Sequence, residues 1–157
     1  MKTKTLRDYV DRGFGFPVAI ERVTLAEIAG DWVPLVDYDE LERQVVEGLP
    51  SKPGRLTGSE VRFIRLHFKM SLSEFARALG VSHVAARKWE QNKTSLAGMQ
   101  WLTEKNLRLF LLHKLNKSPR GFVKLFESLE SKRPAVREPI RIAFSKEVSK
   151  AVPVRPA

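Results

Sequence analysis

A helical pattern that stops at Gly80 and restarts at Ser82 is the feature that most constrains how this chain of 157 residues can fold. In the stretch "SLSEFARALGVSHVAARKWE", residues 71–90, apolar residues recur at helical spacing on both sides of the glycine. Glycine accommodates the backbone turn that ends one helix, and Ser82 can cap the next one. The stretch therefore predicts two short helices, at about 71–79 and 82–91, held at an angle to each other.

The residues of this stretch divide into those that are expected to pack in the core and those that are expected to stay exposed. The apolar side chains of the stretch that are expected in the core are Phe75, Ala76, Leu79, Val81 and Trp89. The positions that remain are small or cationic, and a helix with such a face fits the DNA major groove, which is about 12 Å wide. The residues predicted to face the groove are Ser82, His83, Ala85, Arg87 and Lys88, and those predicted near the phosphates are Lys93 and Thr94.

These exposed residues also have a simpler interpretation. Standing alone, Arg87 and Lys88 would be ordinary solvent-facing charges, and His83 would be only an exposed residue after the cap. The glycine turn and the serine cap that precede them favour a role in DNA binding, in which Arg87 or Lys88 contacts guanine.

The distribution of charge along the chain also favours a nucleic-acid partner. Residues 1–50 hold six Lys and Arg against ten Asp and Glu, a net charge of −4. Residues 51–157 hold twenty-two Lys and Arg against eight Asp and Glu, a net charge of +14. This excess is larger than solubility requires and suits a polyanion. RNA recognition usually displays aromatic residues on a sheet, whereas the aromatic residues here fall in helical stripes, so we favour DNA over RNA.

The first fifty residues predict a small strand-plus-helix unit. Residues 1–15 are polar, end in a segment with two glycines and are predicted to be mostly irregular. Residues 16–36 mix apolar and β-branched residues, which predicts two or three short antiparallel strands. Asp37 with Glu40 three residues later forms a predicted capping box, and a helix follows to about residue 49.

Residues 51–56, "SKPGRL", are predicted to be a linker at a domain boundary, because proline and glycine stand among polar residues there. Residues 57–115 then predict four helices with tight joints, the first capped by Thr57 or Ser59. The predicted fold class is therefore mainly α: a helix-turn-helix bundle with a small N-terminal α/β unit.

Residues 116–157 predict a more irregular end of the chain. Ser118 followed by proline begins a fifth helix, in which Phe122 and Phe126 are expected to pack in the core or in a dimer. "IRIAF" at 140–144 alternates like a strand that returns to the N-terminal sheet, and the final residues, "VPVRPA", are predicted to be disordered.

Four short motifs stand at matching spacing in residues 57–115: "IR" at 64–65, "FA" at 75–76, "LGVS" at 79–82 and "WE" at 89–90. Together they resemble the Xre or λ-repressor-like helix-turn-helix family. The resemblance implies an ion pair between Arg65 and Glu90 that is structural and does not contact DNA. The sequence departs from the family at Leu72, where many relatives have a phosphate-binding glutamine, and at Asn92, where a glycine is usual. Asn92 can still adopt the left-handed conformation of that glycine.

The stretch "LTGSEVRFIRLHF" follows the linker, which in turn follows a strand-rich unit and an acidic helix. This order is similar to that of MqsA-like and HigA-type antitoxins. In the MqsA type, a cysteine-ligated zinc unit binds an RNA-cleaving toxin, while the helix-turn-helix half dimerises and represses the operon. The present chain has no cysteine, so its N-terminal unit would need an apolar core in place of zinc.

From this order of units and from the net acidic charge of residues 1–50, we predict that these residues bind a basic ribonuclease toxin. The acidic residues expected at the rim of that interface are Asp37, Asp39, Glu40, Glu42 and Glu47. The apolar residues expected to supply its buried contacts are Phe16, Val18, Ile20 and Trp32.

Several classes of function lack the residues that they need. The chain has no cysteine and three scattered histidines, so we expect no metal site and no cofactor. No glycine-rich phosphate loop follows a strand and no serine stands in a nucleophile elbow, so no catalytic residue is predicted and the protein is not expected to be an enzyme. The longest apolar run is far shorter than the roughly 20 residues of a membrane helix, and no signal sequence is recognisable, so a cytoplasmic location is expected.

These inferences converge on a sequence-specific DNA-binding transcriptional repressor. One recognition helix reads only a few base pairs, so we expect a homodimer on a palindromic operator, with the second copy about 34 Å away. The repressor is predicted to be the antitoxin of a type II toxin-antitoxin system that regulates its own operon. The alternative is a stand-alone or phage-type regulator with no toxin, whose additional segments serve dimerisation or effector sensing.

Overall fold

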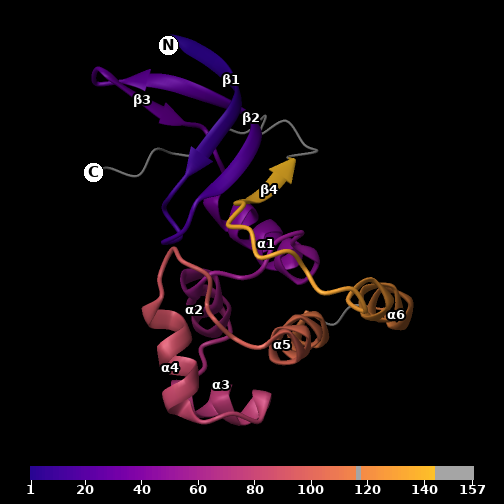
Figure 1. Ribbon diagram of the computed structural model, residues 1–157. Helices are drawn as coiled ribbons and strands as arrows, with labels where there is room; N and C mark the ends of the chain where they lie inside the picture. The colour runs from indigo at the N-terminus through magenta and orange to yellow at the C-terminus, as the bar shows by residue number, and fades with distance from the viewer. Residues whose placement is uncertain (116–117, 144–157) are drawn as a thin grey trace.

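The computed structural model describes residues 1–115 and 118–143, which form a four-stranded mixed sheet and six α-helices (Figure 1). The sheet lies at one end of the molecule, and the helices α2 to α6 lie at the other. The strands are β1 (Thr3–Asp11), β2 (Val18–Ile28), β3 (Asp31–Pro34) and β4 (Ile140–Ala143). The helices are α1 (Tyr38–Gly48), α2 (Gly58–His67), α3 (Leu72–Leu79), α4 (His83–Gln91), α5 (Trp101–Lys114) and α6 (Pro119–Ser128), with a short 3-10 turn, η1, at Leu49–Ser51.

Strand β2 organises the sheet because the other three strands all pair with it. β1 runs antiparallel to β2 along almost its whole length, from Thr3 opposite Ala26 to Asp11 opposite Val18. β3 pairs antiparallel with the end of β2, and β4 pairs parallel with its beginning. The late strand predicted in "IRIAF" therefore exists over 140–143 and returns to the N-terminal sheet, while Phe144 lies outside the described residues.

The prediction of a mainly α-helical helix-turn-helix bundle is wrong for the fold as a whole, which is a small α/β fold. The largest local error lies in residues 1–15, which were predicted to be irregular but contain the nine-residue strand β1. Most of the residues of β1 are exposed, so the strand carries no apolar alternation. Its conformation depends on pairing with β2, which is not visible in local sequence. The predicted disordered end, 152–157, lies outside the described residues.

One hydrophobic core connects the sheet to the helices. It includes Ile20 of β2, Val45 of α1, Val61 of α2 and Leu107 of α5, all at most 1% exposed. The cluster thus joins the two sequence regions that were predicted to be separate units. No helix in the described part of the chain is long and apolar enough to cross a membrane.

The predicted linker at 51–56 is packed between these regions. Lys52 is buried and its Nζ forms an ion pair with Glu60 at 2.7 Å. Arg108 of α5, fully buried, donates hydrogen bonds to the backbone carbonyls of Pro50, Lys52 and Gly54. Desolvation by burial lowers the pKa of Arg108, and Glu104 beside it partly offsets this effect. The segment is therefore a rigid connection between α1 and α2.

Helix α6 stands apart from the main core. Leu125 of α6 and Leu129, directly after its last residue, pack with Leu112 of α5 in a second, smaller cluster, which Trp101 and Leu109 border. In Figure 1, α6 lies on the opposite side of the helical region from α4, with α2 and α5 between them.

Candidate nucleic-acid interface

The turn between α3 and α4 is built as the glycine break predicts. Gly80 ends α3 with φ of 68°, in the left-handed region that glycine adopts without steric cost. The Gly80 N–H donates to Arg77 O at 3.2 Å, and the Val81 N–H donates to Ala76 O at 3.0 Å. Two of the last carbonyls of α3 are thereby satisfied, and the chain leaves the helix at a defined angle.

Helix α4 begins at a serine cap and is anchored by two buried residues. The Ala85 N–H donates to Ser82 Oγ at 3.1 Å, which satisfies one of the free N–H groups of the first turn. Ala86 and Trp89, three positions apart, are 0% and 8% exposed. They fix which side of the helix faces the core, so the opposite side faces solvent.

The exposed side of α4 differs in part from the prediction. Ser82, His83, Arg87 and Lys88 are exposed, as predicted for groove contacts. Ala85 is partly exposed and also packs against the core, because Trp89 lies one turn further along the helix. Two residues that the sequence analysis missed complete the exposed face of α4, Val84 and Gln91. Val84 lies three and four residues before Arg87 and Lys88, and Gln91 lies four and three residues after them, so helical spacing could have identified both.

A buried ion pair fixes α4 against α2. Arg65 Nε donates to Glu90 Oε1 at 2.5 Å, and Arg65 Nη2 donates to Glu90 Oε2 at 3.1 Å. The third guanidinium nitrogen, Nη1, donates to Met70 O at 2.9 Å in the turn between α2 and α3. The two side chains are 12% and 10% exposed. These contacts connect α2 to α4 and to the turn before α3, and they leave neither charge available to a ligand.

Gly58, the first residue of α2, permits a second close contact with α4. A Cβ at this position would lie 2.2 Å from the Trp89 carbonyl oxygen and 2.8 Å from the Lys93 backbone nitrogen. The Gly58 N–H donates to Ser95 O at 3.1 Å, and the Ser59 N–H donates to Lys93 O at 2.9 Å. The start of α2 thus holds the end of α4 by backbone contact.

The left-handed residue after α4 is Lys93 and not Asn92. Lys93 has φ of 49°, whereas Asn92 has φ of −73°. The Asn92 side chain donates instead to Ala97 O at 2.8 Å, which ties the end of α4 to the following segment. The turn that was expected at Asn92 therefore occurs one residue later.

Lys93 and Thr94, the predicted phosphate contacts, are exposed beside the end of α4. They line an open hollow of about 520 Å³ with Ser59, Arg62 and Phe14 among its other walls. Arg62 was not predicted, and it adds a second exposed cation beside Lys93. Glu42 is the one acidic residue that lines the hollow, and Arg62 and Lys93 place two cations in it. Cations beside the end of α4 suit a phosphate backbone that runs past the helix.

Helix α3 contributes less to this surface. Leu72 is half-buried and packs against the core, so its side chain offers no phosphate contact. Ser71 caps the helix by accepting a hydrogen bond from the Glu74 N–H at 3.1 Å. Arg77 is the exposed cation of this helix.

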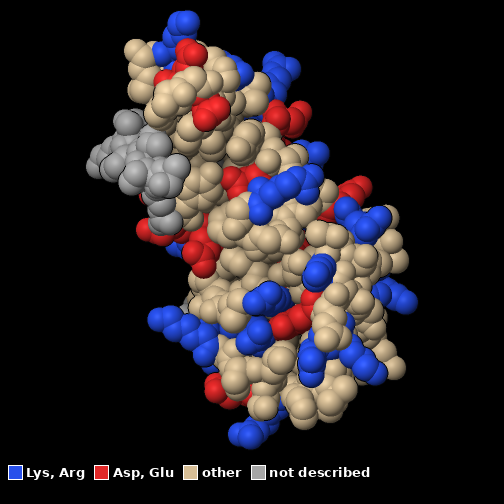
Figure 2. Space-filling view, turned by 90° about the vertical axis from the view of Figure 1, so that its left-hand side faces the viewer, with Lys and Arg blue, Asp and Glu red and all other residues tan. Residues whose placement is uncertain are grey.

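Positive charge gathers on the side of the molecule that carries α4. Figure 2 shows this side, and Lys and Arg lie over its lower half, where Asp and Glu are fewer. The exposed cations of α3, α4 and the segments beside them are Lys69, Arg77, Arg87, Lys88 and Lys93. Such a surface attracts a polyanion.

The surface predicted for a toxin is altered by the fold. Phe16, Val18 and Ile20 are at most 2% exposed and form the core between the sheet and α1, so they are unavailable to a partner. Of the four predicted apolar contacts, Trp32 alone is exposed, at 41%, with Lys4 Nζ 4.2 Å from its ring centroid.

The predicted acidic residues belong to α1 and its cap. Asp37 accepts hydrogen bonds from the backbone N–H groups of Asp39 and Glu40 and thereby caps the helix. Arg43 forms ion pairs with Glu40 and Glu47, and Glu42 Oε1 lies 3.1 Å from His67 Nδ1. Much of the acidic charge of this helix is thus matched within the chain.

Within the residues that the structure describes, no three His, Asp or Glu side chains converge as metal ligands would. Comparisons of the chain with protein-family models, with curated proteins and with solved structures gave no match.

Proposed function

We propose that this protein is a sequence-specific transcriptional repressor that binds duplex DNA with α4 in the major groove. The observation that carries the proposal is the exposed face of α4. Its residues are His83, Val84, Arg87, Lys88 and Gln91, and none of them is acidic. Helix α4 follows the tight turn at Gly80. The Arg65 ion pair and the close backbone contact at Gly58 hold it against α2. A rigid helix whose exposed face is cationic and free of acidic side chains suits insertion into the major groove.

Each exposed residue type has a partner in the groove. Arg87 or Lys88 would donate to O6 and N7 of guanine, a contact that distinguishes the correct base by about 1–3 kcal/mol. Gln91 has the donor and acceptor for adenine, and the Val84 methyl groups suit the methyl of thymine. Ser82 and His83, at the start of the helix, and Lys93 and Thr94, after its end, would bind phosphates and set the register. In this proposal Arg65 and Glu90 are positioning residues.

Between the two kinds of repressor, the structure favours the stand-alone regulator over the antitoxin. An antitoxin of the proposed type needs apolar contacts in residues 1–50, but three of the four predicted ones form the core. A toxin would have to bind through the large apolar side chains of residues 1–50 that stay exposed, chiefly Val10, Trp32 and Tyr38, and through the acidic surface of α1. We therefore propose a cytoplasmic DNA-binding regulator first, and toxin neutralisation as the weaker alternative.

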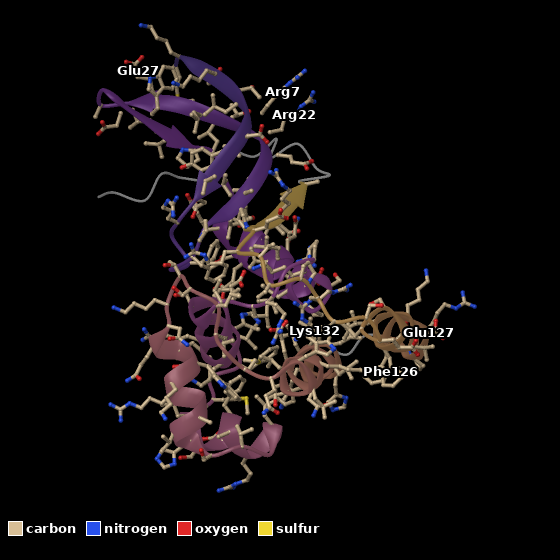
Figure 3. All side chains as sticks on the ribbon, viewed as in Figure 1. Arg7, Arg22, Glu27, Phe126, Glu127 and Lys132 are labelled. Atoms are coloured by element: carbon tan, nitrogen blue, oxygen red, sulfur yellow. The ribbon has the colours of Figure 1, made fainter. Side chains whose placement is uncertain are left out.

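Selection of duplex DNA from a random library by the full chain tests the proposal. We expect enrichment of a defined sequence, and we expect Arg87→Ala and Lys88→Ala to lose affinity for it. Arg7→Ala is the matched control, because it removes one positive charge on the sheet, at the opposite end of the molecule from α4 (Figure 3). Failure to enrich any sequence, or equal losses in all three variants, would contradict base recognition by α4.

A further inference from the structure

Two hollows of the surface meet at Thr94, which lines both of them. The first is the hollow of about 520 Å³ that Arg62 and Lys93 line. The second, of about 330 Å³, lies between the turn after β1, the start of α2 and the segment before β4, and its exposed cations are Arg12 and Arg137. Exposed cations from four separate parts of the chain therefore surround the segment that follows α4.

The carboxylates of the second hollow leave these cations in excess. Glu60 accepts a hydrogen bond from Lys52 Nζ at 2.7 Å, and both side chains are buried, so this pair is neutral as a whole. Glu138 is the exposed carboxylate of the hollow. Neither Arg12 nor Arg137 forms an ion pair among the residues that the structure describes.

The turn that carries Arg12 is fixed relative to α4. The Gly15 N–H donates to Arg12 O at 3.2 Å and closes the turn. Phe14 in this turn packs edge-on against Phe63 of α2, with 5.5 Å between the ring centroids. Helix α2 also holds the end of α4 through Gly58. In Figure 1 the turn between β1 and β2 lies directly above the segment that leaves α4.

The segment that carries Arg137 is fixed as well. The Arg55 N–H donates to Pro134 O at 3.1 Å, and a Cβ on Gly54 would lie 2.6 Å from Val136 O, so this segment packs closely on residues 51–56. After Arg137 the chain enters β4, which pairs with β2. Both of the cations in the second hollow are thus attached to backbone that the core holds in place.

We infer that the turn after β1 and the segment before β4 form a second DNA contact, in which Arg12 and Arg137 bind phosphates beyond those at Lys93 and Thr94. The inference rests on the proposed function, because it takes α4 to lie in the major groove. Cations held close together repel one another, and an anion that lies among them relieves this repulsion. A duplex that continues past the end of α4 supplies such anions as a row of phosphates.

The second contact gives the sheet a part in DNA binding that its net acidic charge conceals. It would add affinity and fix the orientation of the duplex, but it would read no base. The close packing of residues 51–56 then has a function, because a flexible linker would let Arg12 move relative to α4.

A double variant of the full chain, Arg12→Ala with Arg137→Ala, removes both proposed phosphate contacts. Affinity should fall by the same factor on selected and unrelated duplex DNA. The slope of log K against log salt should decrease in magnitude by about 1.8, which is about 0.9 for each lost contact. The matched control is Arg7→Ala with Arg120→Ala, which removes two exposed charges from β1 and α6 and should keep the slope of the wild type. All four side chains are exposed, so both double variants should fold normally.

Ethylation of single phosphates locates the contact on the DNA. With the wild type, ethylation should interfere with binding at phosphates outside the base pairs that α4 reads, and the double variant of Arg12 and Arg137 should lose this interference. Interference confined to the base pairs read by α4, or a double variant whose salt slope equals that of the control, would overturn the second contact.

Arg87→Ala separates this inference from the proposed function. Loss of base discrimination in Arg87→Ala, together with an unchanged salt slope in the double variant of Arg12 and Arg137, would reject the second contact alone. A reduced slope in that double variant, together with unchanged base discrimination in Arg87→Ala, would reject base recognition by α4 and support the phosphate contact.

Discussion

Arg65 and Glu90 form a bidentate ion pair between α2 and α4, with both side chains nearly buried. The carboxylate is the only acidic partner of this guanidinium in the part of the chain that the structure describes. The pair therefore holds the proposed recognition helix against the body of the protein, and its loss should affect stability before it affects any contact with DNA.

Glu90→Gln keeps the shape of the side chain and removes its charge. We expect the free energy of unfolding to fall by about 2–4 kcal/mol, because Arg65 would remain charged in a largely dry site. Urea denaturation measures the change. Glu47→Gln is the control, since its ion pair with Arg43 is half-exposed and should contribute much less to stability. Similar losses in both variants would show that the Arg65 pair has no special role.

Gly58→Ala tests the backbone contact between α2 and α4. The new Cβ would collide with the backbone at Trp89 and Lys93, so α2 and α4 would have to separate. We expect a loss of stability of about 1–3 kcal/mol and weaker DNA binding. At Gly48 a Cβ meets side chains and no backbone atom, Ile140 at 3.0 Å and Ile142 at 3.7 Å. Gly48→Ala should therefore stay within about 1 kcal/mol of the wild type. If thermal denaturation gave the same loss of stability for Gly58→Ala and Gly48→Ala, the close contact of Gly58 with the end of α4 would be unimportant.

The environment of the Tyr38 phenol predicts that the folded protein loses stability at alkaline pH. Burial raises the pKa of its phenol, and the hydrogen bond that its O–H donates to Asp11 Oδ2 at 2.9 Å raises the pKa further. Because the folded pKa exceeds the unfolded value of 10.0, this contribution to stability is complete below pH 10 and is lost as the pH rises toward the folded pKa.

The chain has two tyrosines, so an ultraviolet absorbance titration can follow them separately. Burial also raises the pKa of Tyr9, so in the folded protein both phenols should ionise above their ordinary pH. Tyr38→Phe should lose stability less steeply than the wild type above pH 10. Ionisation of Tyr38 at its ordinary pKa, while the protein is still folded, would contradict its hydrogen bond to Asp11.

Lys93→Asn tests the proposed phosphate contact after α4. Asparagine tolerates the left-handed backbone at this position, so the variant should fold normally. Affinity should fall equally on selected and unrelated DNA, and the slope of log K against log salt should decrease in magnitude by about 0.9. Lys2→Asn, which removes the same charge before β1, should leave both quantities unchanged. A loss confined to the selected sequence would instead place Lys93 at a base.

The helices at 57–115 could be predicted because their signals are local. Thr57 caps α2 in a capping box with Glu60, Ser71 and Ser82 cap α3 and α4, and Gly80 supplies the left-handed turn. Strand β1 could not be predicted in this way, since its polar residues are extended by pairing with β2. The predicted fold class, mainly α, was wrong for the same reason: it left out a strand that only pairing with β2 makes extended.

Which residues of the candidate site are exposed also depends on tertiary packing, which short sequence motifs do not predict. Burial of Ala86 and Trp89 turns Ala85 toward the core and exposes Val84 in its place. Three of the four apolar residues assigned to a toxin interface, Phe16, Val18 and Ile20, are buried because they form the core between the sheet and α1. In each instance tertiary contacts decided which of several apolar side chains remained at the surface.

The most direct test of base recognition by α4 is to measure the affinity of the wild type and of Arg87→Ala for the selected DNA site with each base pair changed in turn. The wild type should discriminate against each mismatched base pair by about 1–3 kcal/mol. Arg87→Ala should lose that discrimination at one position of each half-site and keep it at the others. Equal weakening on every sequence, matched by the same loss on random DNA, would contradict recognition of bases by α4.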